Sequence, residues 1–156
     1  MTEQDREYMT LCLSLAREAA ERDEVPVGAV IVQGDTVIAR ASNTREESKC
    51  ATHHAEILAI EEACRTLGGW RLPNCTLYVT LEPCPMCAGA IANARIDRVV
   101  YGAPDPKGGA LGSLINLAEV PLNHKPQVER GVMEAECAEV LTAYFRRKRK
   151  AREETP

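Results

Sequence analysis

The sequence predicts an α/β fold, a three-layer α/β/α sandwich around a mixed central sheet of about five strands. Segments with helical and strand-like patterns alternate along the chain, which is typical of a sheet covered by helices. Two strand-like segments flank Gly34 and Asp35, so we expect a hairpin that makes the sheet mixed rather than purely parallel. With 156 residues, 45% of them hydrophobic, the chain is long enough for one domain with a core, which we expect to span residues 1–156.

The N-terminal half of the chain is expected to contain two helices separated by the hairpin. The expected elements are a helix over about 5–23, strands at 27–32 and 36–42, a polar loop over 43–52, and a helix over about 54–67. Apolar side chains recur at three- and four-residue steps in the first of these helices, which is the spacing of one helical face. They are Tyr8, Cys12, Leu15 and Ala19. Pro26 and the pair Gly68-Gly69 stand where the two helices must end.

The C-terminal half is expected to add three strands and further helices. The expected elements are a strand at 75–81, a helix over about 85–95, a strand at 98–102, an irregular segment at 103–112, a short helix at 113–117, a weak strand at 127–132, and a last helix from about 134 into the basic tail. Pro85 suits the first turn of its helix, because proline lacks the N–H that this position leaves unbonded. The segment 103–112 is too rich in glycine and proline for a regular element.

The net charge of −4 conceals a strongly basic segment near the C-terminus. RRKRKAR, residues 146–152, contains six of the 19 basic residues. The remaining 13 basic residues face 23 acidic ones, so the rest of the chain has a net charge of −10. Such a run is either a solvated helix end or a contact for phosphates, and the sequence leaves both interpretations open.

Composition also excludes some classes of protein. No apolar run approaches the roughly 20 residues of a membrane span, so we expect no membrane partner. The N-terminal segment MTEQDREYM is polar and acidic, so we expect no secretory signal and a cytoplasmic location. In a reducing compartment, the seven cysteines are expected to bind metal or to pack in the core.

Three residues from two separate segments have the composition of a zinc site. Cys84 and Cys87 are three residues apart at an expected helix start, which places both sulfur atoms on one face, and helix N-terminal amides favour thiolates. His54 also stands at an expected helix start, and in open α/β sheets ligands bind at the carboxyl ends of the strands, where such starts gather. Two thiolates and one imidazole suit tetrahedral Zn²⁺ and leave one coordination position open, which is typical of catalytic zinc sites.

Glu56 stands two residues after His54 and is the candidate catalytic residue. Two residues turn a helix by roughly 200°, so the two side chains cannot bind one metal from the same helix face. If the metal lies beyond the helix end, His54 can bind it while Glu56 acts as a general base toward water. The neighbouring His53 is interpreted as a residue that packs, caps the helix or meets substrate.

The segments HAE at 54–56 and PCPMC at 83–87 resemble the H-x-E…P-C-x-x-C signature that is known for zinc-dependent nucleobase deaminases of the cytidine deaminase superfamily. Other segments, including EVPVGAV, DPKGG and the closing AYFRRKR, are similar to the bacterial tRNA-specific adenosine deaminases over nearly the whole chain. The resemblance implies one Zn²⁺ per subunit on His54, Cys84 and Cys87, with Glu56 moving protons. It also implies a cytoplasmic homodimer that converts adenosine to inosine at the wobble position, 34, of tRNA anticodon loops.

The same resemblance implies which residues meet the tRNA anticodon arm. They are Asn43 and Ala55 at the target nucleoside, Asp105 and Lys107 in a loop that contacts RNA, and Asn123, Phe145, Arg146 and Arg149, with the basic helix end at about 144–152, around the anticodon loop. The sequence departs from the family at His53, where a small residue is usual, and at Tyr144, where a phenylalanine is frequent.

Two other functions remain open on the sequence. A deaminase of a free nucleobase or nucleoside, of the guanine or cytosine type, would share the zinc site but would need no basic tail. A non-catalytic structural zinc module would need a fourth protein ligand, and Cys50, four residues before His54, could supply it. Glu56 argues against the module, because a closed site has no water for a general base to deprotonate.

Overall fold

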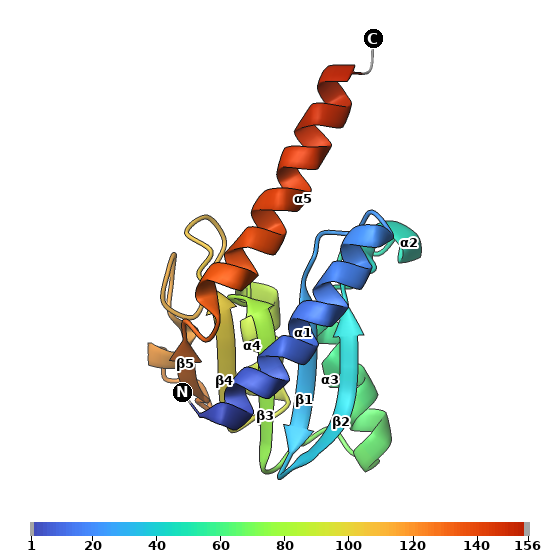
Figure 1. Cartoon of the computed structure of the whole chain (residues 1–156). Helices are drawn as coiled ribbons and strands as arrows, with labels where there is room; N and C mark the ends of the chain where they lie inside the picture. Colours follow the sequence, from blue (N-terminus) through green and yellow to red (C-terminus); the bar gives the residue numbers. More distant parts are fainter. Residues whose placement is uncertain (1, 155–156) are drawn as a thin grey trace.

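A mixed five-stranded sheet lies at the centre of the computed structural model, which describes residues 2–154 (Figure 1). Its strands are β1 (Gly28–Gln33), β2 (Thr36–Ser42), β3 (Cys75–Leu81), β4 (Arg98–Ala103) and β5 (Gln127–Arg130). They lie in the order β2-β1-β3-β4-β5 across the sheet. β1 is antiparallel to β2 and β3, whereas β3, β4 and β5 are parallel to one another. The expected hairpin and the expected mixed sheet are therefore confirmed.

Helices cover both faces of this sheet. They are α1 (Glu3–Glu21), α2 (Arg45–Ser48), α3 (Ala55–Leu67), α4 (Pro85–Asn93), α5 (Glu134–Glu154) and the 3₁₀ turn η1 (Leu117–Glu119). α1 and α5 pack on one face and α3 and α4 on the other, which is the expected three-layer sandwich (Figure 1). The last turns of α5 project beyond the body of the domain (Figure 1). None of the helices within residues 2–154 is both long and apolar enough to cross a membrane.

The central strands are buried on both faces, because two separate hydrophobic clusters use alternate residues of each strand. In β1, Ala29 and Ile31 belong to the cluster beneath α3 and α4, whereas Val30 and Val32 belong to the cluster beneath α1. This alternation follows from the two-residue period of a strand. It explains why the segment VGAVIV is continuously apolar, since neither of its faces meets solvent.

The strand directions bring three loops to one edge of the sheet. β2 and β3 are both antiparallel to β1 and therefore run the same way, as does β4. Their carboxyl ends meet at one edge, and the segments that follow carry Asn43, Cys84 and Asp105. The same rule of α/β sheets predicted that His54, Cys84 and Cys87 converge, and the structure brings these three residues together.

Two expectations for the connecting segments are wrong in detail. The polar loop at 43–52 contains the short helix α2, whose first N–H groups are bonded by the buried carboxylate of Glu24. The short helix expected at 113–117 is absent. Gly112 there has a φ of +133°, and the Ser113 N–H donates to the side chain of Glu82, so the segment is held in turns before η1 begins.

Candidate metal and catalytic site

A cavity of about 410 Å³ opens at the edge where β2, β3 and β4 end. Segments from across the sequence line it, and α5 closes one side. The lining residues are Val25, Val27, Asn43, Arg45, His54, Glu56, Leu81, Glu82, Cys84, Pro104, Asp105, Leu141 and Phe145. The cavity therefore extends from the candidate metal ligands His54 and Cys84 to Phe145, at the start of the basic C-terminal segment.

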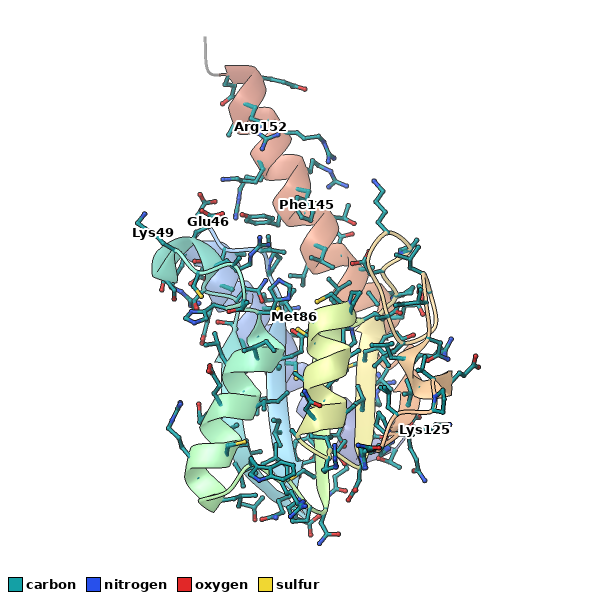
Figure 2. All side chains as sticks on the ribbon, turned by 180° about the vertical axis from the view of Figure 1, so that it is seen from behind. Glu46, Lys49, Met86, Lys125, Phe145 and Arg152 are labelled. Atoms are coloured by element: carbon teal, nitrogen blue, oxygen red, sulfur yellow. The ribbon has the colours of Figure 1, made fainter. Side chains whose placement is uncertain are left out.

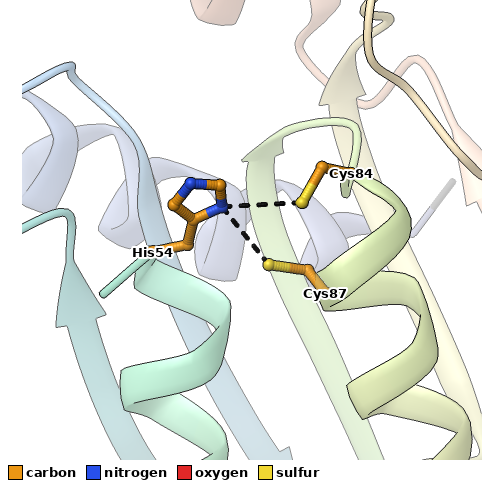
Figure 3. Close-up of side chains that lie close together, drawn as sticks. All are labelled: His54, Cys84 and Cys87. Atoms are coloured by element: carbon orange, nitrogen blue, oxygen red, sulfur yellow. Dashed lines mark hydrogen bonds between the residues drawn. The ribbon is translucent and has the colours of Figure 1, made fainter. Parts of the chain in front are cut away.

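His54, Cys84 and Cys87 meet at one end of this cavity (Figure 3). Nδ1 of His54 lies 3.6 Å from Sγ of Cys84 and 3.5 Å from Sγ of Cys87. His54 is the N-cap of α3 and Cys84 the N-cap of α4, while Cys87 lies in the first turn of α4. Within residues 2–154, these three residues are the cluster whose ligand atoms all lie within 4.8 Å of one another.

The spacing of the three ligand atoms fits tetrahedral Zn²⁺. With Zn–N and Zn–S bonds of about 2.0 and 2.3 Å, tetrahedral angles separate the nitrogen from each sulfur by about 3.5–3.6 Å. The observed distances from Nδ1 of His54 agree with this separation. One nitrogen and two sulfur donors are also the set that zinc accepts, so the residues present fit the metal. The structure further identifies Nδ1 as the ring nitrogen of His54 that faces the sulfur atoms, which the sequence could not show.

Hydrogen bonding within the cluster favours a thiolate at Cys84. The hydrogen bond with Cys87, joined by the one with His54, lowers the pKa of the Cys84 thiol to about 4, although partial burial acts in the opposite direction. The pKa of Cys87 is raised, because it is hydrogen-bonded to Cys84 and buried. The hydrogen bond with Cys84 raises the pKa of the His54 imidazole. A thiolate is the form of cysteine that binds metal.

Glu56 faces the same cavity from the first turn of α3, and only 3% of its surface is exposed. Burial raises the pKa of its carboxyl group to about 7. A carboxyl group with a pKa near neutrality can both accept and return a proton at physiological pH. The arrangement can therefore support acid–base chemistry beside a metal.

Asn43 and Ala55, both expected at the target nucleoside, are joined to each other. Oδ1 of Asn43 accepts a hydrogen bond of 2.8 Å from the backbone N–H of Ala55. Asn43 lines the cavity, whereas the side chain of Ala55 is fully buried in the hydrophobic cluster beneath α3 and α4. The structure thus places Asn43 in the cavity and Ala55 directly behind it.

The other residues expected to contact RNA are dispersed. Asp105 and Phe145 line the cavity, and Phe145 is 43% exposed. Lys107, Arg146 and Arg149 are exposed and lie outside the cavity lining. Asn123 lies in the loop before β5, beside His124, whose ring contacts the backbone oxygen of Ile96, two residues before β4.

This position places Asn123 toward the amino end of β4, away from the metal cluster of its own chain. Figure 2 shows the same separation for the nearby Lys125, which lies at the far end of the sheet from Phe145. The structure therefore does not bring Asn123 together with the other expected site residues within one chain.

Cys50 and His53 flank the metal cluster without joining it. Sγ of Cys50 lies 3.4 Å from the hydroxyl of Thr52, and Cys50 is outside the group of three ligand atoms. Nδ1 of His53 is buried and has no hydrogen-bond partner within the described part of the chain. The fourth protein ligand that a structural zinc module needs is therefore not supplied by Cys50.

Sequence reasoning missed two polar residues that line the cavity, Arg45 and Glu82. Arg45 opens α2, and this helix was expected to be loop. Glu82 directly precedes the PCPMC segment, and its carboxylate binds the loop after β4. The sequence signal that could have identified Glu82 is a carboxylate placed between an apolar strand and the PCPMC motif. A carboxylate that is buried at such a position needs hydrogen-bond partners.

Comparisons with known proteins agree with this site. Residues 3–149 match the MafB19-like deaminase family. The tRNA-specific adenosine deaminase of Bacillus subtilis (strain 168) is 53% identical over 148 residues, covering 94% of this chain and 92% of that protein. A solved structure from work on A-to-I editing by tRNA:A34 deaminases at the wobble position of transfer RNA has a TM-score of 0.83 at 52% identity. It covers 86% of this chain and 99% of that chain.

A guanine deaminase of Bacillus subtilis provides a comparison with a free-base enzyme. Its structure has a TM-score of 0.62 at 33% identity and covers 79% of this chain and 88% of that chain. Both identity and structural overlap are lower than for the tRNA:A34 deaminase structure. The chain therefore belongs to the MafB19-like deaminase family and to the tRNA-specific adenosine deaminases.

Proposed function

We propose that this protein deaminates adenosine to inosine at position 34 of tRNA anticodon loops. The observation that carries the proposal is one cavity that joins Glu56 and the His54, Cys84 and Cys87 cluster to Phe145 on the basic helix α5. The reaction consumes one water and releases one ammonia. We propose that residues 1–156 act as one deaminase domain, with the basic helix end at about 144–152 belonging to its RNA site.

His54, Cys84 and Cys87 would hold one Zn²⁺ per subunit. When bound there, Zn²⁺ would supply Lewis-acid chemistry that makes water a nucleophile near neutral pH. Glu56 accepts a proton from the attacking water and gives it to ring N1 of adenine. The water oxygen bonds to C6, and its second proton, passed through Glu56 to the exocyclic amine, lets the nitrogen leave C6 as ammonia. The buried position of Glu56 supports this role, because burial raises the pKa of its carboxyl group to about 7.

Features at the cavity mouth favour an RNA substrate over a free base. Phe145 offers an exposed aromatic face on which a base can stack, and Arg146 and Arg149 follow it on α5. The unpaired bases of an anticodon loop can leave their stack at low cost, which the target base must do to enter the cavity. Asn43 and Asp105, which both line the cavity, are proposed to contact the target base and its neighbours. A free-nucleobase deaminase would have no use for the basic helix end.

We further propose a homodimer that acts in the cytoplasm on its tRNA. Exposed apolar side chains lie on α4 and on the segment between β4 and β5, and they support an interface there. They are Met86, Leu114, Ile115, Val120 and Leu122. Lys107 and Asn123, which lie outside the cavity lining of their own chain, are proposed to contact RNA, Asn123 from the dimer partner.

The test is incubation of the zinc-loaded protein with a tRNA that carries A34, with inosine as the readout. Free adenosine and free guanine are assayed beside it at the same enzyme concentration. We expect inosine at position 34 and little conversion of either small substrate. Efficient guanine turnover without inosine in tRNA would contradict the proposal and favour a free-base deaminase.

A further inference from the structure

A single buried carboxylate organises the loop that follows β4. Glu82, the residue directly after β3, is 2% exposed and accepts hydrogen bonds from four donors of this loop. Oε1 accepts from the backbone N–H of Asp105 at 3.0 Å and from the hydroxyl of Ser113. Oε2 accepts from the backbone N–H groups of Leu111 and Ser113 at 3.0 and 3.1 Å. The side chain of Glu82 therefore accepts hydrogen bonds from both ends of a nine-residue segment, residues 105–113.

The loop is also shaped around this carboxylate. A Cβ atom at Gly109 would lie 2.2–2.5 Å from the carboxyl carbon and oxygens of Glu82, well inside van der Waals contact. Residue 109 thus has no room for a side chain while Glu82 keeps its position. The contact at Gly109 is independent of the hydrogen bonds, and both indicate that the loop conformation depends on the carboxylate.

The held segment forms one rim of the cavity. Pro104 and Asp105, which follow β4, line the cavity together with Asn43 and Arg45, which follow β2. The backbone N–H of Asp105 donates a hydrogen bond to Glu82. Oδ1 of Asp105 in turn accepts a hydrogen bond of 3.1 Å from the backbone N–H of Lys107. Movement of Glu82 would therefore shift both residues that are proposed to contact RNA in this loop.

We propose that Glu82 is a positioning residue that holds the loop 105–113 preformed as an RNA-binding rim. The inference rests on the proposed function. Glu82 acts through the loop rather than on the reacting atoms, since its oxygens are occupied by four donors and its side chain is buried. A preformed rim reduces the entropy cost of ordering this loop when RNA binds. Losing the preformed rim should therefore weaken RNA binding and leave the chemical step unchanged.

Glu82→Gln is the principal test, because glutamine keeps the shape but has one acceptor oxygen where the loop requires two. Its NH₂ group would face donors that it cannot accept from. Gly109→Ala perturbs the same contact from the loop side and leaves Glu82 unchanged in sequence. Glu119→Gln is the matched control, because Glu119 is exposed and lies just beyond the held segment.

The substrate is an anticodon stem-loop carrying A34, and kcat, KM and zinc content are measured for each variant. We expect Glu82→Gln and Gly109→Ala to raise KM at least about tenfold while kcat stays within about twofold and zinc content is unchanged. Hydrogen exchange at the amides of Asp105, Leu111 and Ser113 should be faster in both. Glu119→Gln should match the wild type in all four measurements.

The outcomes separate this inference from the proposed function. A wild-type protein that leaves A34 unconverted contradicts the proposed function itself. A wild type that converts A34, together with variants that keep its KM or lose kcat alone, overturns the positioning role. If Glu82→Gln did not fold, Ser113→Ala would test the positioning role in its place. It removes one of the four donors and leaves the carboxylate in place, so KM should rise about two- to fivefold at constant kcat, and an unchanged KM would contradict the role.

Discussion

The backbone N–H of Ala55 donates to Oδ1 of Asn43 at 2.8 Å, which ties the end of β2 to the first turn of α3. Because the side-chain oxygen is occupied, the NH₂ group is the part of Asn43 that remains for the cavity it lines. The hydrogen bond therefore fixes the position of the Asn43 side chain and also which end of its amide group faces the cavity. Asn43 presents a hydrogen-bond donor beside His54 and Glu56.

Two substitutions at Asn43 should separate these two tasks. Asn43→Asp keeps an acceptor for the Ala55 N–H but replaces the donor, so it should fold like the wild type and raise KM for the A34 stem-loop by roughly tenfold or more. Asn43→Ala also leaves the buried N–H unpaired and should lower the unfolding free energy by about 1–3 kcal/mol. Steady-state kinetics and denaturant titration measure the two effects. Equal KM values for Asn43→Asp and the wild type would contradict the donor role.

Glu56→Gln should abolish proton transfer while leaving the metal in place. Glutamine keeps the size of the side chain, and Glu56 is not one of the three clustered ligands. Deamination should fall by at least the roughly 10²–10⁴-fold that is typical of a lost acid–base group. Inosine formation and zinc content are measured on the same sample. A parallel loss of zinc would show that Glu56 is a ligand.

Cys84 and Cys50 offer a matched pair of cysteine substitutions. Cys84→Ser should lose zinc and activity, because it removes one of three ligands from the cluster. Cys50→Ser should retain one zinc per chain and full activity, since Sγ of Cys50 contacts Thr52 rather than the cluster. Metal analysis after gel filtration checks both. Zinc loss in Cys50→Ser would revive the structural module with four protein ligands.

Asp5 provides a prediction about stability and pH. Its carboxylate, 1% exposed, accepts hydrogen bonds from both terminal nitrogens of Arg98 at 2.9 Å and from the hydroxyl of Tyr78 at 2.7 Å. The hydrogen bond from Arg98 holds the pKa of Asp5 well below its usual range, although burial acts to raise it. The ionised form thus favours the folded state. Its contribution is complete above the unfolded-state pKa of about 3.9 and is lost as the pH falls below that value.

Asp5→Asn should accordingly lower the unfolding free energy by roughly 2–3 kcal/mol at pH 7. The difference between variant and wild type should shrink as the pH is lowered from about 5 toward about 2, because Asp5 becomes protonated in the unfolded state over this range while Arg98 keeps it ionised in the folded state. Urea titrations at several pH values measure this. Glu7→Gln, an exposed site on the same helix, is the control and should show no such trend. A difference that stayed constant with pH would exclude a linked ionisation at Asp5.

The sequence predicted the sheet well, because the core strands are continuous apolar segments that stand out from the polar and glycine-containing segments around them. It placed the inward face of α1 less accurately. The expected face used Tyr8 and Leu15, whereas Met9 and Ala16 are fully buried and those two only partly. Both sets have helical spacing, and only the angle at which α1 crosses the sheet decides between them.

The candidate site divides in the same way. His54, Cys84 and Cys87 could be anticipated, because residue type and helix starts constrain a metal cluster. Glu82 could not be assigned a role, since its four donors lie 23–31 residues further along the chain. α2 was missed for a similar reason, because its first N–H groups are satisfied by Glu24 from a distant segment. Such long-range carboxylate contacts leave no periodic signal in the sequence.

The C-terminal basic segment gives the last prediction. Tyr144 is buried and its hydroxyl donates to the backbone oxygen of Asp23, whereas its neighbour Phe145 is exposed. Arg147 and Lys148 contact the body of the domain, at the backbone oxygen of Ala20 and the carboxylate of Asp23. The side chains of Arg146 and Arg149 are exposed and make no hydrogen bond or ion pair within residues 2–154. One side of α5 is therefore anchored, and the other is available for phosphates.

Removing residues 146–156 should leave a folded, zinc-loaded protein, because the exposed Lys148–Asp23 ion pair contributes little to stability. Binding to the A34 stem-loop should weaken, and its salt dependence should become shallower by roughly 0.7–0.9 in log–log slope for each lost phosphate contact. The double variant Arg146→Ala/Arg149→Ala should reproduce much of this loss. Arg147→Ala/Lys148→Ala removes the same number of charges from the anchored side and should reduce the slope less. Equal slopes for the truncated and full-length proteins would mean that the basic segment is only a solvated helix end.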